Sequence, residues 1–288
     1  PIKRVATTSC THIGFLKELN MLDVVCGVCN PEIIYDEYIR ERVDAGYVKN
    51  VGDAMMPNVE LIANSAPDVV MVSTYAQGDA ATDKLNKLGM PVIYNNEWTE
   101  SHPLARAEWL RFTAAFFDML PYADSVFATI ESKYLSLCEL TKDIAHKKTI
   151  MSGNNFRGTW YMPSGTTYMG MLFNDAGADY FYKNDKSAFS LPLNVETVVM
   201  NFSNADVWVW SSARSLNELA STDEKHTWFK SFKTGQVYNF LARTTDTGGN
   251  DFWESGVVHP ELVLKDLINI IYPDILPADS LYFSEQLQ

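Results

Sequence analysis

A chain of 288 residues is long enough for two modest domains or one large one, and its hydrophobic fraction of 47% is enough to build their cores. The sequence has no uninterrupted apolar stretch of the ~18 residues that a membrane-spanning helix requires. The formal net charge of −13 argues against binding to a nucleic-acid backbone, which depends on clustered Lys and Arg, and favours a partner with a positive docking surface.

The first part of the chain alternates between short apolar runs, typical of buried strands, and amphipathic runs, typical of helices. Asn58 is a suitable cap for one of these helices, because its side chain accepts hydrogen bonds from the free amides of a first helical turn. Strands that alternate with helices at this spacing predict a mostly parallel sheet with helices on both faces. We expect strands at residues 4–8, 24–28, 69–73 and 91–94, and helices at residues 13–19, 58–65 and 81–88.

A strongly helical region follows. Two helices are expected, at residues 104–119 and 122–145, and Pro121 separates them because proline breaks or kinks a helix. At 1.5 Å per residue the second helix would be about 35 Å long, which is long enough to connect two lobes.

The alternation of strands and helices then restarts. The predicted fold class is therefore α/β, with two Rossmann-like lobes of mostly parallel sheets joined by a single long helix. The expected boundaries are residues 1–120 for the N-terminal lobe, 121–146 for the linking helix and 147–288 for the C-terminal lobe. Within the last of these we expect strands at residues 149–152, 207–210 and 236–238, helices at 168–176, 197–202 and 260–272, and a polar, Gly-rich loop at 243–256.

One short phrase occurs in both halves of the chain. Residues 57–60 are PNVE, and residues 193–196 are LNVE. After each copy, a helical stretch leads to an Asp-Val pair at the start of a strand, at residues 68–69 and 206–207. This shared context indicates that the two halves are similar and that each offers one glutamate at an equivalent position.

The order of these elements resembles that of the class III periplasmic solute-binding proteins of ABC importers, which deliver siderophore-bound iron, haem or vitamin B12. The resemblance covers nearly the whole chain. The segments that carry it are RV at 4–5, VG at 51–52, PNVE at 57–60, APDVV at 66–70, LGMPV at 88–92, DAGA at 175–178 and NVE at 194–196.

The resemblance implies a non-enzymatic carrier that captures an iron complex, such as a siderophore-type chelate, in a cleft between its lobes and delivers it to the membrane permease. It also implies that Glu60 and Glu196 dock into arginine-containing pockets of the permease dimer. Both residues are expected in the first turn of a helix, where the helix dipole favours a negative charge. The alternative is that they are ordinary helix-start acids. We expect a monomer, with no cofactor and no metal of its own.

The implied location is periplasmic or extracytoplasmic, with a lipid anchor to a membrane through a segment outside this sequence. Because the sequence begins with Pro1 rather than Met, we expect it to start inside a longer gene product, so that an export signal would not be visible here.

Residues that follow the strands are candidates for ligand binding, because ligands of open parallel sheets lie beyond the carboxyl ends of the strands. Arginines bind carboxylates through paired hydrogen bonds, and aromatic rings stack on planar ligands. This mixture suits an anionic iron chelate. The candidate ligand-binding residues are His12, Tyr35, Tyr75, Trp98, Arg157, Trp160, Arg243 and Trp253.

Some of these residues have a structural interpretation as well. His12 could serve only to begin a helix, and Tyr75 could either coordinate haem iron or pack beside a loop. Trp208 and Trp210 lie within a predicted strand, so we expect them in the core or at the surface of the lobe rather than at the ligand.

Three other functions remain open. Within the same family, the chain could carry cobalamin or haem. A chelatase-like enzyme would have to rely on His12 with Cys10, or on Cys26 and Cys29, and the sequence lacks a Gly-rich phosphate loop and an H-E-x-x-H motif. A structural or adhesion module would bind no chelate at all.

Cys26 and Cys29 are spaced for zinc or redox chemistry, but we expect plain buried thiols, because a second pair of zinc ligands at matching spacing is missing.

Overall fold

The computed structural model describes residues 1–74, 80–277 and 280–288. The chain divides into two compact units, each with its own five-stranded sheet. The expected C-terminal lobe of residues 147–288 differs from this division, because Thr244–His259 groups with the N-terminal residues. Unit 1 consists of Pro1–Thr99, Ala105–Thr129 and Thr244–His259, and unit 2 consists of Glu100–Leu104, Ile130–Arg243 and Pro260–Gln288.

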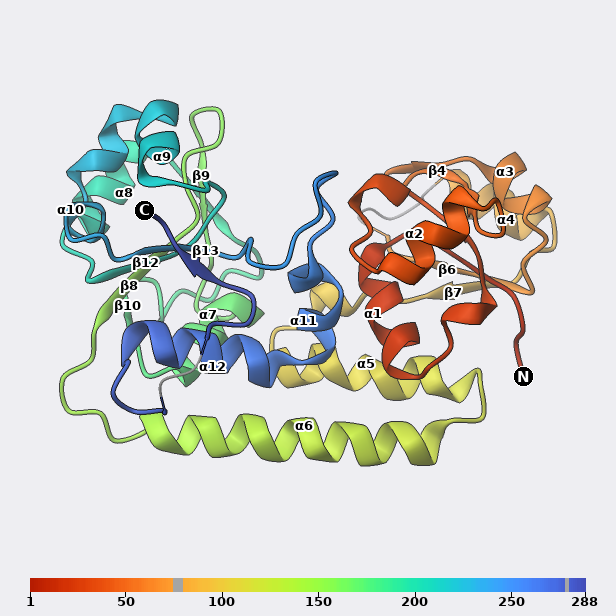
Figure 1. The fold of residues 1–288 in the computed structure, drawn as a ribbon, viewed down its shortest axis with the longest axis horizontal. Coiled ribbons are helices and arrows are strands. Elements are labelled where there is room, and N and C mark those ends of the chain that lie inside the picture. The colour runs from red at the N-terminus through yellow and green to blue at the C-terminus, as the bar shows by residue number, and fades with distance from the viewer. Residues whose placement is uncertain (75–79, 278–279) are drawn as a thin grey trace. The chain divides into compact units, whose positions relative to one another are not determined.

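The sheet of unit 1, in which Figure 1 labels β6 and β7, is parallel throughout, with the strand order β3-β2-β1-β6-β7. Its three central strands are buried along their whole length, as expected for apolar runs with helices on both faces. The strands are β1 (Val5–Thr7), β2 (Val25–Val28), β3 (Lys49–Asn50), β6 (Val69–Val72) and β7 (Val92–Tyr94), and a separate hairpin pairs β4 (Gly52–Asp53) with β5 (Met56–Pro57).

Side-chain caps fix the starts of the helices in unit 1. Ser9 accepts a hydrogen bond from the Thr11 amide at the start of α1, and Asp36 accepts one from the Ile39 amide at the start of α2. The helices are α1 (Cys10–Glu18), α2 (Glu37–Asp44), α3 (Val59–Asn64), α4 (Ala80–Lys87) and α11 (Ser255–Val258), with 3-10 turns η1 (Leu22–Val24), η2 (Pro31–Ile33), η3 (Glu97–Thr99) and η5 (Asp251–Trp253).

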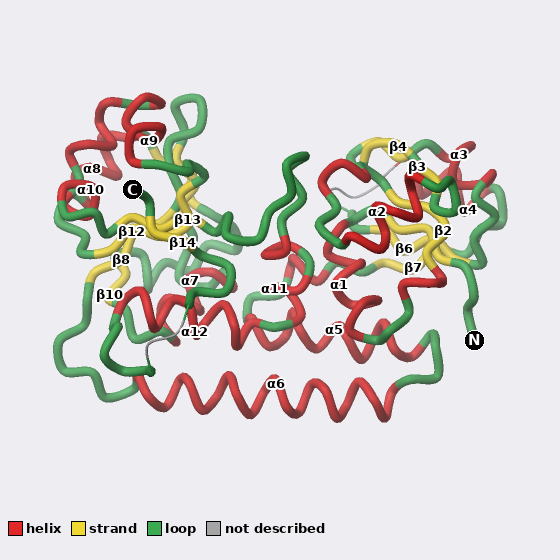
Figure 2. Tube along the Cα trace, in the orientation of Figure 1, coloured by secondary structure: helices red, strands yellow, loops and turns green. Residues whose placement is uncertain are grey.

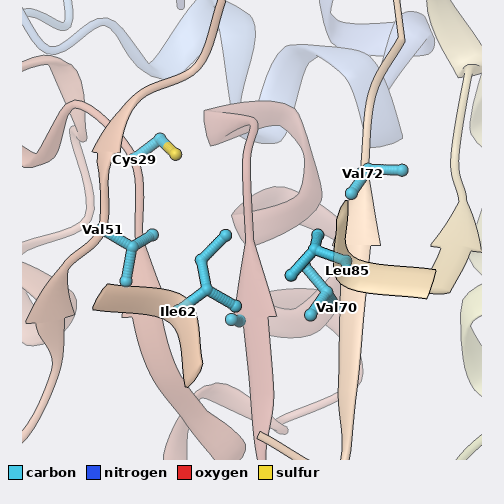
Figure 3. Packing of buried hydrophobic residues seen from close by; sticks show 7 residues of the cluster. Cys29, Val51, Ile62, Val70, Val72 and Leu85 are labelled. Carbon is cyan, nitrogen blue, oxygen red and sulfur yellow. The ribbon is translucent and has the colours of Figure 1, made fainter. Parts of the chain in front are cut away.

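A cluster of buried apolar side chains holds α3 and α4 against this sheet. Ile62 of α3 and Leu85 of α4 belong to the same cluster as strand residues Val70 and Val72, and Figure 3 shows them from close by. Cys29 belongs to it too, and burial raises the pKa of its thiol to about 12. Cys26 is also buried, and Cys26 and Cys29 form no disulfide, so the expectation that both thiols are buried is confirmed.

Two helices connect the first half of the chain to the second. They are α5 (Pro103–Ala115) and α6 (Leu120–Thr141). Pro121 does not break α6 but lies in its first turn, where the missing N–H of proline would have no partner in any case. The division between the two units falls inside α6, after Thr129. Among the helices of the described residues, none is both long and apolar enough to span a membrane.

The sheet of unit 2 has the order β10-β8-β12-β13-β14, and only the last pair is antiparallel. Figure 2 shows this sheet and its surrounding helices as a tube. Its strands are β8 (Thr149–Ser152), β10 (Asp179–Tyr180), β12 (Val207–Ser211), β13 (Val237–Asn239) and β14 (Glu285–Gln286), and a separate ribbon pairs β9 (Trp160–Met162) with β11 (Leu191–Leu193).

The helices of unit 2 follow the predicted alternation, with the addition of short ones before β13. They are α7 (Tyr168–Asp175), α8 (Val195–Phe202), α9 (Leu216–Thr222), η4 (Glu224–Trp228), α10 (Lys230–Lys233) and α12 (Pro260–Ile271). Tyr134 of α6 donates a hydrogen bond to the Asp175 carboxylate (2.6 Å), which ties α6 to α7.

The repeated Asp-Val pair has the same structural role in both units. Asp68 Oδ2 accepts the amides of Lys3 (2.8 Å) and Arg4 (3.0 Å), and the Asp68 amide donates to the Arg4 carbonyl (2.9 Å). Asp206 Oδ2 accepts the amide and hydroxyl of Thr149 (both 2.9 Å), and the Asp206 amide donates to the Thr149 carbonyl (3.0 Å). Each aspartate therefore joins the starts of two neighbouring parallel strands.

The Asp206→Ala variant tests this role, because it leaves the amide and hydroxyl of Thr149 without their acceptor. We expect it to lower the free energy of unfolding by about 1–3 kcal/mol in urea titrations. Glu131→Ala, on an exposed turn of α6, is the control and should change it by less than about 0.5 kcal/mol. Equal effects of the two substitutions would contradict the assignment.

Candidate functional site

The carboxyl edge of the unit 1 sheet is a network of polar groups that bind one another. The Ser73 amide after β6 donates to Thr8 Oγ1 after β1 (3.0 Å), and the Thr74 amide donates to Asn96 Oδ1 after β7 (2.8 Å). Three neighbouring strands are thus joined at their ends.

His12 lies within this network and is fully buried. Its Nε2 is 3.2 Å from the Asn95 carbonyl oxygen, so this nitrogen carries the proton, and its Nδ1 accepts from the Thr7 hydroxyl (2.6 Å). Burial lowers the pKa of His12 to about 4, so the ring is neutral at pH 7. Both ring nitrogens bind groups of the same unit and no part of the side chain is exposed, which argues against contact with a ligand, and a ligand role for His12 stays a prediction.

Trp98 lies beside a buried ion pair. Arg106 donates two hydrogen bonds to Glu97 Oε2 (2.6 and 2.8 Å), and both side chains are almost fully buried. Trp98 itself is half-buried in η3. The pair fixes the start of the segment after β7, and a ligand role for Trp98 stays a prediction. Tyr75 lies outside the described residues.

A hollow of about 600 Å³ opens in unit 1 beside the start of α2. Tyr35, a predicted ligand residue, lies on its wall, and Lys17 of α1 forms an ion pair with Asp36 there (2.9 Å). Its side chains are charged or carry hydroxyl groups, so it suits a polar molecule. The hollow is lined by Lys17, Tyr35, Asp36, Glu37, Tyr38, Arg40, Thr244, Thr245 and Asp246.

Glu254 fixes the backbone on one side of this hollow. It is fully buried, and its carboxylate accepts the amides of Tyr35 (2.5 Å) and Asp36 (3.0 Å). Burial raises the pKa of Glu254 to about 8, and the nearby Asp36 and Asp251 add to the increase. The expectation of a loop at residues 243–256 is wrong in part, because η5 and α11 form within this part of the chain and belong to unit 1.

The raised pKa of Glu254 predicts a pH dependence of stability. A carboxyl whose pKa is 4.5 when unfolded and about 8 when folded stabilises the fold fully below pH 4.5, and this contribution is lost as the pH rises through about 8. The free energy of unfolding should therefore fall between pH 5 and pH 9, and it should fall less in Glu254→Gln. An identical pH dependence in both proteins would contradict the assignment.

At the carboxyl edge of the unit 2 sheet, asparagines build the loop that carries Arg157. Asn154 Oδ1 accepts the amide and hydroxyl of Ser212 after β12 (both 3.0 Å), and Asn155 Oδ1 accepts the Gly158 amide (3.0 Å). Arg157 lies at the tip with φ +52°, exposed, and its guanidinium lies 5.1 Å from the ring centre of Phe156, which is exposed as well. This arrangement presents a cation and an aromatic face side by side.

Trp160 is part of the core of unit 2. It is fully buried, its indole N–H donates to the Ser152 carbonyl (2.8 Å), and its ring contacts those of Trp208 and Phe229. This burial argues against contact with a ligand, and a ligand role for Trp160 stays a prediction. Trp208 and Trp210 are also buried, as predicted from their strand.

The last two candidates fall in different units. Arg243 belongs to unit 2, is half-buried, and stacks over the Tyr282 ring at 4.5 Å. Trp253 belongs to unit 1, is half-buried in η5, and meets the ring of Phe252 edge-on. A ligand role for either stays a prediction.

The two repeated glutamates occupy equivalent, exposed places. Asn58 caps α3 and Asn194 caps α8, and each helix carries its glutamate in the first turn. Glu196 Oε1 binds Lys225 Nζ (2.6 Å), and this hydrogen bond lowers the pKa of Glu196. Both carboxylates are exposed at helix starts, where the dipole favours their charge.

Comparisons with known proteins identify the family. The family described as periplasmic binding protein matches residues 5–243, so the chain belongs to the periplasmic binding protein family, as its sequence predicted. This class comprises substrate-binding transport proteins of the ABC type rather than enzymes. An uncharacterized lipoprotein of Methanocaldococcus jannaschii is 27% identical over a match that covers 98% of this chain and 68% of that protein.

Solved structures confirm the predicted fold class. A periplasmic haem-binding protein of Pseudomonas aeruginosa is similar with a TM-score of 0.77 at 12% identity, with 100% of this chain and 99% of that chain covered. CeuE of Helicobacter pylori with bound Ni(II) is similar with a TM-score of 0.71 at 17% identity. The match covers 96% of this chain and 85% of that chain.

Proposed function

We propose that this protein captures an iron complex of the siderophore type and delivers it to the permease of an ABC importer. The observation that carries the proposal is membership of the periplasmic binding protein family along most of the chain. The extracytoplasmic location that this function requires is supported by the lipoprotein relatives. We propose that a lipid anchor lies in a segment outside this sequence.

The chemistry of the carboxyl edges supports an anionic chelate as the substrate. Arg157 is exposed next to an exposed aromatic ring, and Arg243 is stacked on Tyr282, so both guanidinium planes are oriented by a neighbouring ring. A guanidinium held in this way is suited to forming paired hydrogen bonds with a carboxylate or a catecholate oxygen.

Haem or cobalamin is the second candidate substrate. The haem-binding protein of Pseudomonas aeruginosa, which is similar along the whole chain, and the exposed Phe156 support it. The burial of His12 argues against this residue as an axial ligand of haem iron.

Arg157 provides the first test of the substrate class. The Arg157→Ala variant should bind ferric citrate or a ferric catecholate siderophore at least about tenfold more weakly, equivalent to about 1.4 kcal/mol, because it removes a charged pair of donors. Quenching of tryptophan fluorescence measures the dissociation constant. Lys186→Ala, which removes an exposed cation from another loop of unit 2, is the control. An unchanged dissociation constant for Arg157→Ala would remove this residue from the site.

Glu60 and Glu196 are proposed to dock on the permease dimer. The two carboxylates would give only modest affinity each and would mainly set the register of a complex that must dissociate again. In the complex, an arginine of the permease would replace Lys225 as the partner of Glu196.

The double variant Glu60→Ala and Glu196→Ala should therefore abolish stimulation of the ATPase activity of the transporter while leaving the dissociation constant for the chelate unchanged. Glu41→Ala with Glu139→Ala is the control, because it removes one exposed helical glutamate from each unit elsewhere. Normal stimulation by the first double variant would refute the docking assignment.

A further inference from the structure

A pocket of about 320 Å³ lies in unit 2 at the end of the sheet opposite Arg157. It is bordered by Thr149 and Asp179, the first residues of β8 and β10, and by residues 203–205 just before β12. In a parallel sheet these are the amino ends of the strands. The pocket is therefore separate from the ligand-binding edge, which lies at their carboxyl ends.

Half of the residues that line the pocket are apolar or aromatic, and the other half are polar or charged. Phe202 of α8 is buried, and its ring is in contact with those of Tyr180 and Phe181 at 5.9 and 5.7 Å between centres. The hydrogen bond that Asn201 donates to the Tyr182 hydroxyl (2.8 Å) holds the helix against this aromatic group. The pocket is thus bordered by rings that pack against one another and by a helix that a hydrogen bond joins to them.

Two of its lining residues expose large apolar surfaces to solvent. Met200 is 76% exposed and Phe181 is 58% exposed. The ion pair of Lys183 with Asp179 (2.6 Å) adds a polar rim. An apolar centre with exposed anchors and a polar rim is the usual composition of a protein–protein contact.

Met200, which lines the pocket, lies on the same helix as the proposed docking glutamate. Glu196 and Met200 are four residues apart on α8, so they are neighbours on one face of the helix. Glu196 carries the negative charge that an arginine of a membrane partner would match, and Met200 leads from this charge into the pocket.

Unit 1 also exposes apolar side chains near its own glutamate, at positions that differ from those in unit 2. Leu61, next to Glu60 on α3, is exposed, and so are Met55 and Met56 in the hairpin that leads into this helix. Single exposed apolar residues are common and need no explanation. Exposed apolar residues near the repeated glutamate in both units are consistent with contact to one partner.

We propose that the pocket beside α8 receives an apolar side chain of the transmembrane permease, adjacent to the arginine that pairs with Glu196. The inference rests on the proposed function and adds to it a specific contact that anchors the complex. Methionine suits such a contact, because its flexible side chain adapts to a surface that must bind and release.

The test is the affinity for an ABC transporter, reconstituted in nanodiscs, whose ATPase activity the wild-type protein stimulates. The double variant Phe181→Ser and Met200→Ser should bind it at least about tenfold more weakly, since it removes the two exposed anchors. Leu135→Ser, at a similarly exposed position of α6, is the matched control and should change the affinity less than about twofold. The melting temperature and the affinity for ferric citrate should be the same in all three proteins.

The proposal would be overturned if the double variant bound the transporter with an affinity within about twofold of the wild type. That result is expected if the pocket instead binds a small aromatic solute. If Glu196→Ala still weakened the complex with the transporter, that result would contradict only the pocket proposal and the proposed function would stand. A wild-type protein that bound no ABC permease would contradict both the function and the pocket.

Discussion

The structure depends on one constraint that occurs twice: an aspartate joins the starts of two neighbouring parallel strands. Asp68 does so between β6 and β1, and Asp206 between β12 and β8. With the strand starts aligned, the polar loops collect at the opposite, carboxyl edge, and the helix before each aspartate is fixed together with its strand. Glu60 lies eight residues before Asp68 and Glu196 lies ten residues before Asp206, so the position of each exposed glutamate follows from the same constraint.

The site could be predicted from the sequence only in part. Residues that follow the strands do gather at the carboxyl edges, and Arg157 is exposed there as a residue in a glycine-containing loop should be. His12 and Trp160 lie at the same edges but point into the cores, where each meets a hydrogen-bond partner that belongs to another segment. The position of a residue in the sequence predicts where its backbone lies in the fold. Whether its side chain points inward depends on tertiary contacts with hydrogen-bond partners in other segments.

The fold was more predictable, because its signals are local. Buried strands are continuous apolar runs, and Asn58 and Asn194 cap the helices that they precede. The inclusion of Thr244–His259 in unit 1 had no local signal. It depends on the burial of Glu254 and on Gly14, where a Cβ atom would lie 2.2 Å from the Glu254 carbonyl oxygen. Such a close approach between distant segments can be recognised only once both are placed.

The most direct test of the account is a titration of the protein with ferric siderophores, ferric citrate, haem and cyanocobalamin, followed through the fluorescence of its seven tryptophans. The account predicts saturable, stoichiometric binding of an anionic iron complex, tighter than that of haem or cyanocobalamin and without chemical turnover. Saturable binding of none of these compounds, or catalytic conversion of any of them, would contradict a carrier of iron complexes.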